Sequence, residues 1–208
     1  MKRKLEDIYY RLLERFSYQS WWPADSKDEM VIGALLTQNT SWNNVEIAIT
    51  NMKRENLCSL EKIFKADCEV LKKCIKPAGF FNQKASYLKN IAEFFVKNGS
   101  FNKLDMFDNA TLRKKLLSVK GVGKETADSI LLYAFNRAVF VVDAYTRRLV
   151  ERHNLLKEIS YDNIQHLFES NLKKDSSLFG EYHALIVKNA KVFCKTKPLC
   201  YNCPILGI

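Results

Sequence analysis

Glycine and proline, the residues that most often form turns, are scarce in this chain. Its 208 residues include 7 glycines and 4 prolines, whereas average usage would give about 25 such residues. A β-sandwich or β-barrel needs turn residues roughly every 8 to 12 positions. The shortage therefore argues against a β-rich fold and favours long helices. A hydrophobic fraction of 47% also excludes wholesale disorder.

Apolar residues recur at helical spacing along most of the sequence, which predicts an all-α fold. Ser26 and Glu29 have the spacing of a capping box, while Gly99 and Asp108 are well placed to end one helix and to cap the next. The run 139–142 is β-like, but it is too short and solitary to form a sheet. We expect helices over residues 3–16, 26–35, 45–52, 59–65, 67–75, 82–98, 109–118, 125–136, 143–153, 161–172 and 178–193.

The charge balance points to an anionic partner. Lysine and arginine number 33 against 23 aspartates and glutamates, which gives a net charge of +10. Such an excess most simply indicates nucleic acid, although a merely basic soluble protein is the alternative.

Two further features bear on where the protein works. The sequence has no apolar stretch of the roughly 18 residues that a membrane span needs, and its N-terminus is charged and amphipathic, unlike a signal peptide. We therefore expect a soluble, cytoplasmic protein without a membrane partner. Six cysteines without a secretory signal favour reduced thiols or a metal site over disulfides.

The most specific local pattern is a glycine hairpin, which reads Leu116-x-x-Val119-x-Gly121-Val122-Gly123-x-x-x-Ala127-x-x-Ile130-Leu131. Two helices joined by Gly-Val-Gly would leave free N–H groups at the positive start of the second helix, where a phosphate can bind. The pattern predicts a helix-hairpin-helix that contacts DNA through Lys120, Gly121, Val122, Gly123 and Lys124. A tight turn between two packed helices is the alternative.

This hairpin, followed about 20 residues later by Val-Val-Asp143, resembles the helix-hairpin-helix DNA glycosylases of the endonuclease III superfamily. Leu35-Leu-Thr-Gln38-Asn-Thr, Gly79-Phe-Phe-Asn-Gln-Lys84-Ala85 and a cysteine-rich C-terminus agree in order and spacing. The resemblance covers nearly the whole chain. It implies one HhH-GPD unit, residues 1–208, of two closely packed helical lobes. One lobe is 24–135 with the hairpin at 112–136, and the other is 1–23 plus 136–208 with the cysteine loop.

Asp143 is the candidate catalytic residue. By itself it reads as a helix N-cap, but the matching aspartate of the family is catalytic. Cleavage of an N-glycosidic bond builds positive charge on the sugar, and a fixed carboxylate can stabilise that charge and orient or deprotonate the attacking water.

Glu125 stands where the resemblance places a lysine in bifunctional members of the superfamily. A carboxylate cannot form the Schiff base that leads to strand cleavage, so the resemblance implies a monofunctional, hydrolytic enzyme without AP-lyase activity. Lys124 is one residue away and should point elsewhere, because one residue is about 100° around a helix. An acidic residue favoured in a first helical turn is the alternative reading of Glu125.

The aromatic residues resemble a base pocket. Trp21, Trp22 and Pro23, with Trp42, are similar to the pocket residues of bacterial type III 3-methyladenine DNA glycosylases. Electron-rich ring faces attract a positively charged alkylated purine more than a neutral base. The alternative is that these tryptophans simply fill the core.

In the same family, residues that match Gln38 and Phe80 insert into the duplex beside the flipped nucleotide. The alternatives are a polar residue at a helix C-terminus for Gln38 and a core contact for Phe80.

Three C-terminal cysteines, Cys194, Cys200 and Cys203, resemble the iron–sulfur loop of endonuclease III-like enzymes. The first spacing is shorter by one, and no fourth cysteine occurs before Ile208. The alternatives are a [4Fe–4S] cluster with an incomplete protein ligand set, its fourth ligand from His183, an exogenous thiol or solvent; zinc held by three cysteines and one histidine; and no metal. Cys58, Cys68 and Cys74 fall in the other lobe and are poor substitutes. No organic cofactor is expected.

These features together favour a monomeric, monofunctional glycosylase that acts on double-stranded DNA containing a damaged base and releases alkylated purines such as 3-methyladenine. An endonuclease III-like enzyme for oxidised pyrimidines or mismatches is the second reading. A non-catalytic helix-hairpin-helix DNA-binding protein is the third.

Overall fold

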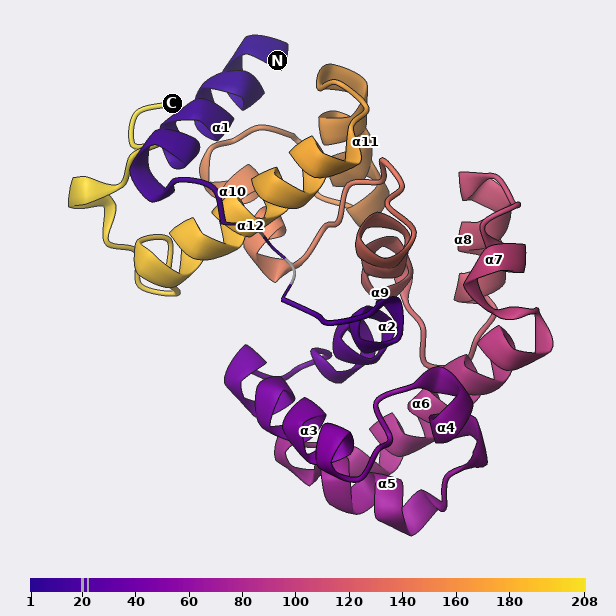
Figure 1. Ribbon diagram of the computed structural model, residues 1–208. Helices are drawn as coiled ribbons and strands as arrows, with labels where there is room; N and C mark the ends of the chain where they lie inside the picture. Colours follow the sequence, from indigo (N-terminus) through magenta and orange to yellow (C-terminus); the bar gives the residue numbers. More distant parts are fainter. Residues whose placement is uncertain (20, 22) are drawn as a thin grey trace. The chain divides into compact units, whose positions relative to one another are not determined.

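The computed structural model describes residues 1–208 except Ser20 and Trp22, and all secondary structure in these residues is helical (Figure 1). The all-α prediction is therefore confirmed. The chain divides into a central unit, Ala24–Phe135, and a terminal unit formed by Met1–Pro23 with Asn136–Ile208.

The central unit is built around α2 (Lys27–Leu36), which is buried from Val31 to Leu36. A helix that is apolar on all sides belongs in a core, and here α3, α6, α9 and η2 pack against it. The elements that follow α2 are α3 (Trp42–Arg54), α4 (Leu60–Lys65), α5 (Cys68–Ile75), the 3-10 turn η1 (Lys76–Ala78), α6 (Phe81–Lys97), α7 (Ser100–Leu104), α8 (Asn109–Leu117), α9 (Lys124–Ser129) and the π-helical segment η2 (Ile130–Ala134).

The terminal unit consists of α1 (Lys2–Phe16), α10 (Ala144–Arg152), α11 (Tyr161–Asn171), α12 (Ser176–Val192) and the short η3 (Cys200–Asn202). Helix α12 packs against α1 and α10. The Tyr182 hydroxyl of α12 donates to the Leu5 carbonyl of α1 at 2.8 Å. The run 139–142 is buried, has no regular secondary structure and forms no strand with any described residue. Its Phe140 stacks on Phe168 with ring centroids 4.0 Å apart, which places this run in the core.

Local capping explains where several helices begin. The Ser26 hydroxyl accepts a hydrogen bond from the Glu29 N–H at 3.1 Å, as the capping-box spacing predicts. The Glu29 carboxylate, however, reaches the N–H of Asp25 at 3.3 Å. Asp108 caps α8 by accepting from the Thr111 N–H at 2.9 Å. Gly99 follows the end of α6 with φ +81°, a conformation that glycine adopts readily.

Candidate functional site

The glycine hairpin joins α8 to α9 in the central unit. Val119 and Val122 are buried beneath the turn, and the Val122 N–H donates to the Val119 carbonyl at 3.0 Å. Lys120, Gly123 and Lys124 are exposed. Because the first N–H groups of a helix have no partner within that helix, the start of α9 is a suitable seat for an anion.

The two glycines of the turn have different surroundings. Gly121 has φ +102°, and a Cβ added there would lie 2.2 Å from a ring carbon of Tyr87. Gly123 has φ −90° and is the N-cap of α9, and a Cβ added there would meet no atom within 4 Å. Gly121 is therefore required by the fold itself, whereas Gly123 keeps an open approach to the backbone.

A buried ion pair holds the two helices of the hairpin together. The Asp128 carboxylate of α9 is fully buried, and the Arg113 guanidinium of α8 meets it at 2.6 Å and 2.9 Å through Nε and Nη2. Such a two-point contact fixes geometry as well as charge.

Replacing Arg113 with methionine should lower the free energy of unfolding by about 3–5 kcal/mol, because it leaves a buried carboxylate without its main partner. Guanidinium unfolding followed by circular dichroism measures this change. The exposed pair between Lys97 and Glu93 supplies the control, since Glu93→Gln should change stability by about 0.5 kcal/mol or less. If Arg113→Met and Glu93→Gln lowered the free energy of unfolding equally, burial would not be the reason that the Arg113–Asp128 pair stabilises the fold.

Gln38 and Phe80, the two predicted insertion residues, also belong to the central unit. Phe80 is 66% exposed and has φ +46°, which is unusual for a non-glycine residue, directly before α6. Gln38 is half-buried, and its amide nitrogen donates to the Gly121 carbonyl at 3.0 Å and to the Thr126 hydroxyl at 2.9 Å. The Phe80 side chain is thus presented to solvent, whereas the Gln38 amide is hydrogen-bonded to the hairpin.

Asp143 lies in the terminal unit directly after the buried run 139–142 and is the N-cap of α10. One carboxylate oxygen accepts from the Thr146 N–H at 2.7 Å, and the other lies 3.4 Å from Nε2 of the buried His183 of α12. Burial raises the pKa of the Asp143 carboxyl, but the adjacent His183 imidazole and the Thr146 N–H outweigh burial and hold this pKa below its usual value. The side chain is 13% exposed. Asp143 is therefore an ionised carboxylate in a mostly buried, fixed position.

The structure describes three of the four residues predicted to form the base pocket. Trp21 is half-buried in the terminal unit, where the Lys191 ammonium lies 5.8 Å from the centre of its ring, and the adjacent Pro23 is exposed. Trp42 is half-buried at the start of α3 in the central unit. Trp22 lies outside the described residues.

The C-terminal cysteines do not form a ligand set. The Cys194 sulfur accepts from the Arg152 guanidinium at 3.2 Å, the Cys203 thiol donates to the Asn189 side chain at 3.8 Å, and Cys200 is exposed. Burial raises the pKa of the Cys203 thiol. Within the described part of the chain, no group of three or more cysteine, histidine or acidic side chains could hold a metal ion.

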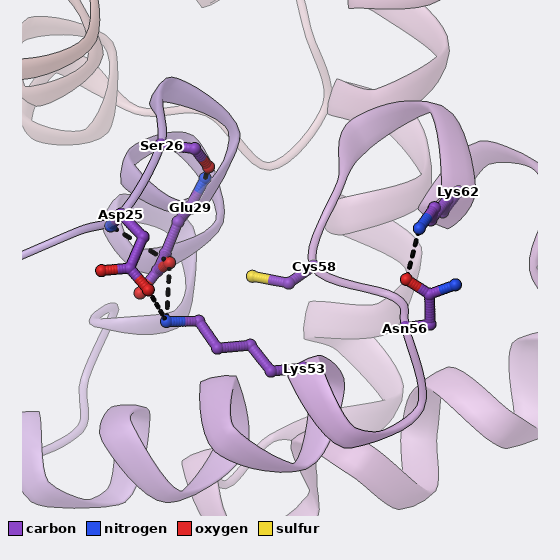
Figure 2. A pocket seen from close by; sticks show the side chains of 7 residues that line it. All are labelled: Asp25, Ser26, Glu29, Lys53, Asn56, Cys58 and Lys62. Atoms are coloured by element: carbon purple, nitrogen blue, oxygen red, sulfur yellow. Dashed lines mark hydrogen bonds and ion pairs between the residues drawn. The ribbon is translucent and has the colours of Figure 1, made fainter.

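A pocket in the central unit offers no chemistry for a base (Figure 2). The Lys53 ammonium pairs with Asp25 at 2.7 Å and with Glu29 at 2.9 Å, so both carboxylates share one cationic partner. Burial raises the pKa of the Cys58 thiol to about 11, which makes it a poor nucleophile. The residues that line this pocket are Asp25, Ser26, Glu29, Lys53, Asn56, Cys58 and Lys62, and they include no aromatic ring.

Residues 32–174 match the family described as HhH-GPD superfamily base excision DNA repair protein. The chain belongs to this superfamily. It is 53% identical over 95% of its length, and 92% of the relative's, to a Methanocaldococcus jannaschii protein assigned as a DNA repair glycosylase. It is 29% identical to the endonuclease III of Sulfolobus acidocaldarius, over 84% of this chain and 78% of that one.

The fold agrees with this assignment to the HhH-GPD superfamily. The H. pylori 3-methyladenine DNA glycosylase bound to 1,N6-ethenoadenine is 30% identical, with a TM-score of 0.77 over 91% of this chain and 95% of that one. An endonuclease III in a trapped covalent complex with DNA has a TM-score of 0.82 at 18% identity, over 99% of this chain and 93% of that one. This HhH-GPD protein is therefore a base excision repair DNA glycosylase. None of the helices among its described residues is long and apolar enough to cross a membrane.

Proposed function

We propose that this glycosylase hydrolyses the N-glycosidic bond of alkylated purines, such as 3-methyladenine, in double-stranded DNA. The observation that carries the proposal is Asp143, an ionised, mostly buried carboxylate held by Thr146 and His183. Similarity to the H. pylori 3-methyladenine DNA glycosylase, at 30% identity, supports this choice of substrate class. The proposed enzyme works as a monomer and needs no metal or organic cofactor.

Hydrolysis of a cationic alkylpurine requires one fixed carboxylate and no strong general acid. An alkylated purine carries positive charge, so the C–N bond breaks with its electron pair moving to the base, which leaves as a neutral molecule. The sugar develops oxocarbenium character, which the negative charge of Asp143 stabilises. Water then adds to the sugar carbon, and its proton passes to Asp143 or to solvent. The product is an abasic site in an intact strand.

The aromatic rings would recognise the charged base. The electron-rich face of a tryptophan attracts a cation, and Trp21 already has the Lys191 ammonium 5.8 Å from its ring centre. The base-recognition role that the family resemblance implies for Trp21, Trp22, Pro23 and Trp42 is part of this proposal. Recognition by stacking and charge would favour cationic lesions over neutral ones.

The hairpin would hold the DNA backbone at the start of α9. Exposed Lys120 and Lys124 supply positive charge, and the open side of Gly123 lets a phosphate approach the helix N-terminus. Phe80, exposed at the start of α6, would enter the duplex beside the flipped nucleotide. Gln38 would enter with it when DNA replaces the bonds of its amide to the Gly121 carbonyl and the Thr126 hydroxyl.

Substituting Gly123 with alanine should weaken binding to duplex DNA about 10- to 100-fold, which corresponds to the loss of one charged hydrogen bond. The added methyl group would have no protein atom within 4 Å, so the free energy of unfolding should change by about 1 kcal/mol or less. Fluorescence anisotropy with a labelled duplex measures the affinity.

Gly121→Ala is the matched comparison, because its methyl group would collide with Tyr87 at a positive φ. This variant should lose about 1–3 kcal/mol of stability. Unchanged DNA affinity of a folded Gly123→Ala protein would contradict the proposed phosphate seat.

Substrate class is tested with duplexes that each carry one defined lesion, either a cationic alkylpurine, a neutral ethenoadenine or an oxidised pyrimidine. The proposal expects the fastest release for the cationic purine. Release restricted to the oxidised pyrimidine would support an endonuclease III-like substrate range instead.

A further inference from the structure

Lys84 is a buried lysine whose charge has no evident role in the chemistry proposed above. It lies on α6 and is 2% exposed. Its ammonium donates to the Leu36 carbonyl and to the Ala78 carbonyl, both at 2.8 Å. Burial lowers the pKa of Lys84 to about 8, because desolvation disfavours the charged form. Burying a charge costs free energy unless hydrogen bonds compensate for the lost water, and the two carbonyls supply those hydrogen bonds to Lys84.

Each of these carbonyls directly precedes a turn that carries a proposed insertion residue. Leu36 is the last residue of α2, and the following turn, closed by a hydrogen bond from the Thr40 N–H to the Thr37 carbonyl at 3.2 Å, presents Gln38. Ala78 is the last residue of η1, and Phe80 follows two residues later. The Lys84 backbone N–H also donates to the Phe80 carbonyl at 2.9 Å. Lys84 thus holds the bases of both turns.

The same helix fixes the glycine hairpin. Tyr87, one turn further along α6, packs its ring against Gly121, and the Asn90 side chain donates to the Lys120 carbonyl at 3.0 Å. Gln38 completes the connection through its hydrogen bonds to Gly121 and Thr126. The Gln38 turn, the Phe80 turn and the hairpin are therefore tied to one another through one stretch of α6, all within the central unit.

We propose that Lys84 is a positioning residue that sets the Gln38 and Phe80 turns in register with the phosphate-binding hairpin, so that the three elements engage DNA together. This inference rests on the proposed function, in which both residues enter the duplex. One ammonium that holds two carbonyls from separate segments restricts both turns at once. An apolar side chain would fill the same space without orienting either carbonyl.

The test uses a duplex with 2-aminopurine next to a tetrahydrofuran abasic analogue. 2-Aminopurine brightens when it loses stacking, so its fluorescence reports entry of the protein into the helix without any base release. At saturating protein, Lys84→Met should reduce the fluorescence rise by about fivefold or more, while affinity for an undamaged duplex stays within about twofold of wild type.

Lys89→Met is the matched control. Lys89 also lies on α6, and its ammonium likewise donates to two backbone carbonyls, those of Phe64 and Ala66, away from the DNA-binding segments. This variant should keep the wild-type fluorescence rise. Equal losses in the Lys84 and Lys89 variants would overturn the proposal, because they would show only a general loosening of α6.

A double-mutant cycle separates positioning from a merely structural role. If Lys84 acts through Phe80, the loss caused by Lys84→Met should shrink in a Phe80→Ala background, with a coupling of about threefold or more. The same factor of loss in both backgrounds, or a wild-type response from folded Lys84→Met protein, would overturn the inference.

The stability of the Lys84→Met variant and the response of the wild-type protein are checked first. If Lys84→Met does not reach the wild-type unfolding midpoint, Lys84→Gln carries the same measurements, since its shorter, uncharged amide cannot span both carbonyls. A wild-type protein that gives no fluorescence rise would overturn the proposed insertion of Phe80 and Gln38 itself, and the inference about Lys84 with it.

Discussion

Asp143→Asn should release alkylated purines about 10²- to 10⁴-fold more slowly than the wild-type protein, while still binding the lesion duplex. An amide has the shape of the carboxylate but no negative charge to place against the oxocarbenium-like sugar. Single-turnover assays on a duplex with one alkylated purine measure the rate of base release, and anisotropy measures binding.

The local structure makes this substitution a clean test of charge. Asparagine is as good an N-cap as aspartate, so the contact with the Thr146 N–H at 2.7 Å can persist and α10 should remain folded. Asp175→Asn is the matched control, because Asp175 caps α12 in the same unit by accepting from the Ser177 and Leu178 N–H groups. The control should release bases at the wild-type rate. Base release by Asp143→Asn within about threefold of wild type would remove Asp143 from the mechanism.

Glu125→Lys should convert the protein into one that borohydride traps on DNA, whereas the wild-type protein should give no trapped adduct. By the family resemblance, position 125 is where bifunctional members carry the lysine whose amine attacks the sugar carbon of an abasic site and loses water to form an iminium ion. Borohydride then reduces that iminium to a stable amine. Denaturing gel electrophoresis of labelled DNA counts the covalent complex.

Glu125→Gln serves as the control for this experiment, since it removes the negative charge without supplying an amine. It should remain untrapped. A trapped adduct with the wild-type protein would show that another amine reaches the sugar, and the proposal of a monofunctional enzyme would then be wrong.

The helices could be predicted from the sequence because the apolar spacing and cap residues that indicate them lie within each helix or at its ends. Apolar spacing indicated the helices, and the cap residues Ser26 and Asp108 indicated two of their starts. Helix α7 was missed because a five-residue helix directly after Gly99 has too few residues to show a period. The π-helical segment Ile130–Ala134 was read as ordinary helix, since an extra backbone residue in one turn leaves no mark on composition.

The site was predictable only in its motif residues. Spacing singled out Asp143 and the hairpin, but no pattern indicated that His183 would lie beside Asp143, because the two residues are 40 positions apart. Likewise, the motif at residues 79–85 contains Lys84 but did not indicate its role. Lysine is rarely buried, and the two carbonyl partners of Lys84 come from separate segments. The Arg113–Asp128 pair was missed because charged residues usually lie on solvated helix faces. Long-range side-chain pairing of this kind requires coordinates.

The most direct measurement uses a duplex with one cationic alkylpurine, incubated with the wild-type protein and then divided in two. Chromatography of one half should show the free alkylpurine, and the strand should stay intact until alkali cleaves it at the lesion in the other half. This result would establish hydrolysis to an abasic site without lyase activity. Tight binding with no released base would contradict the proposed glycosylase activity on this lesion, and strand cleavage before alkali would contradict a monofunctional enzyme.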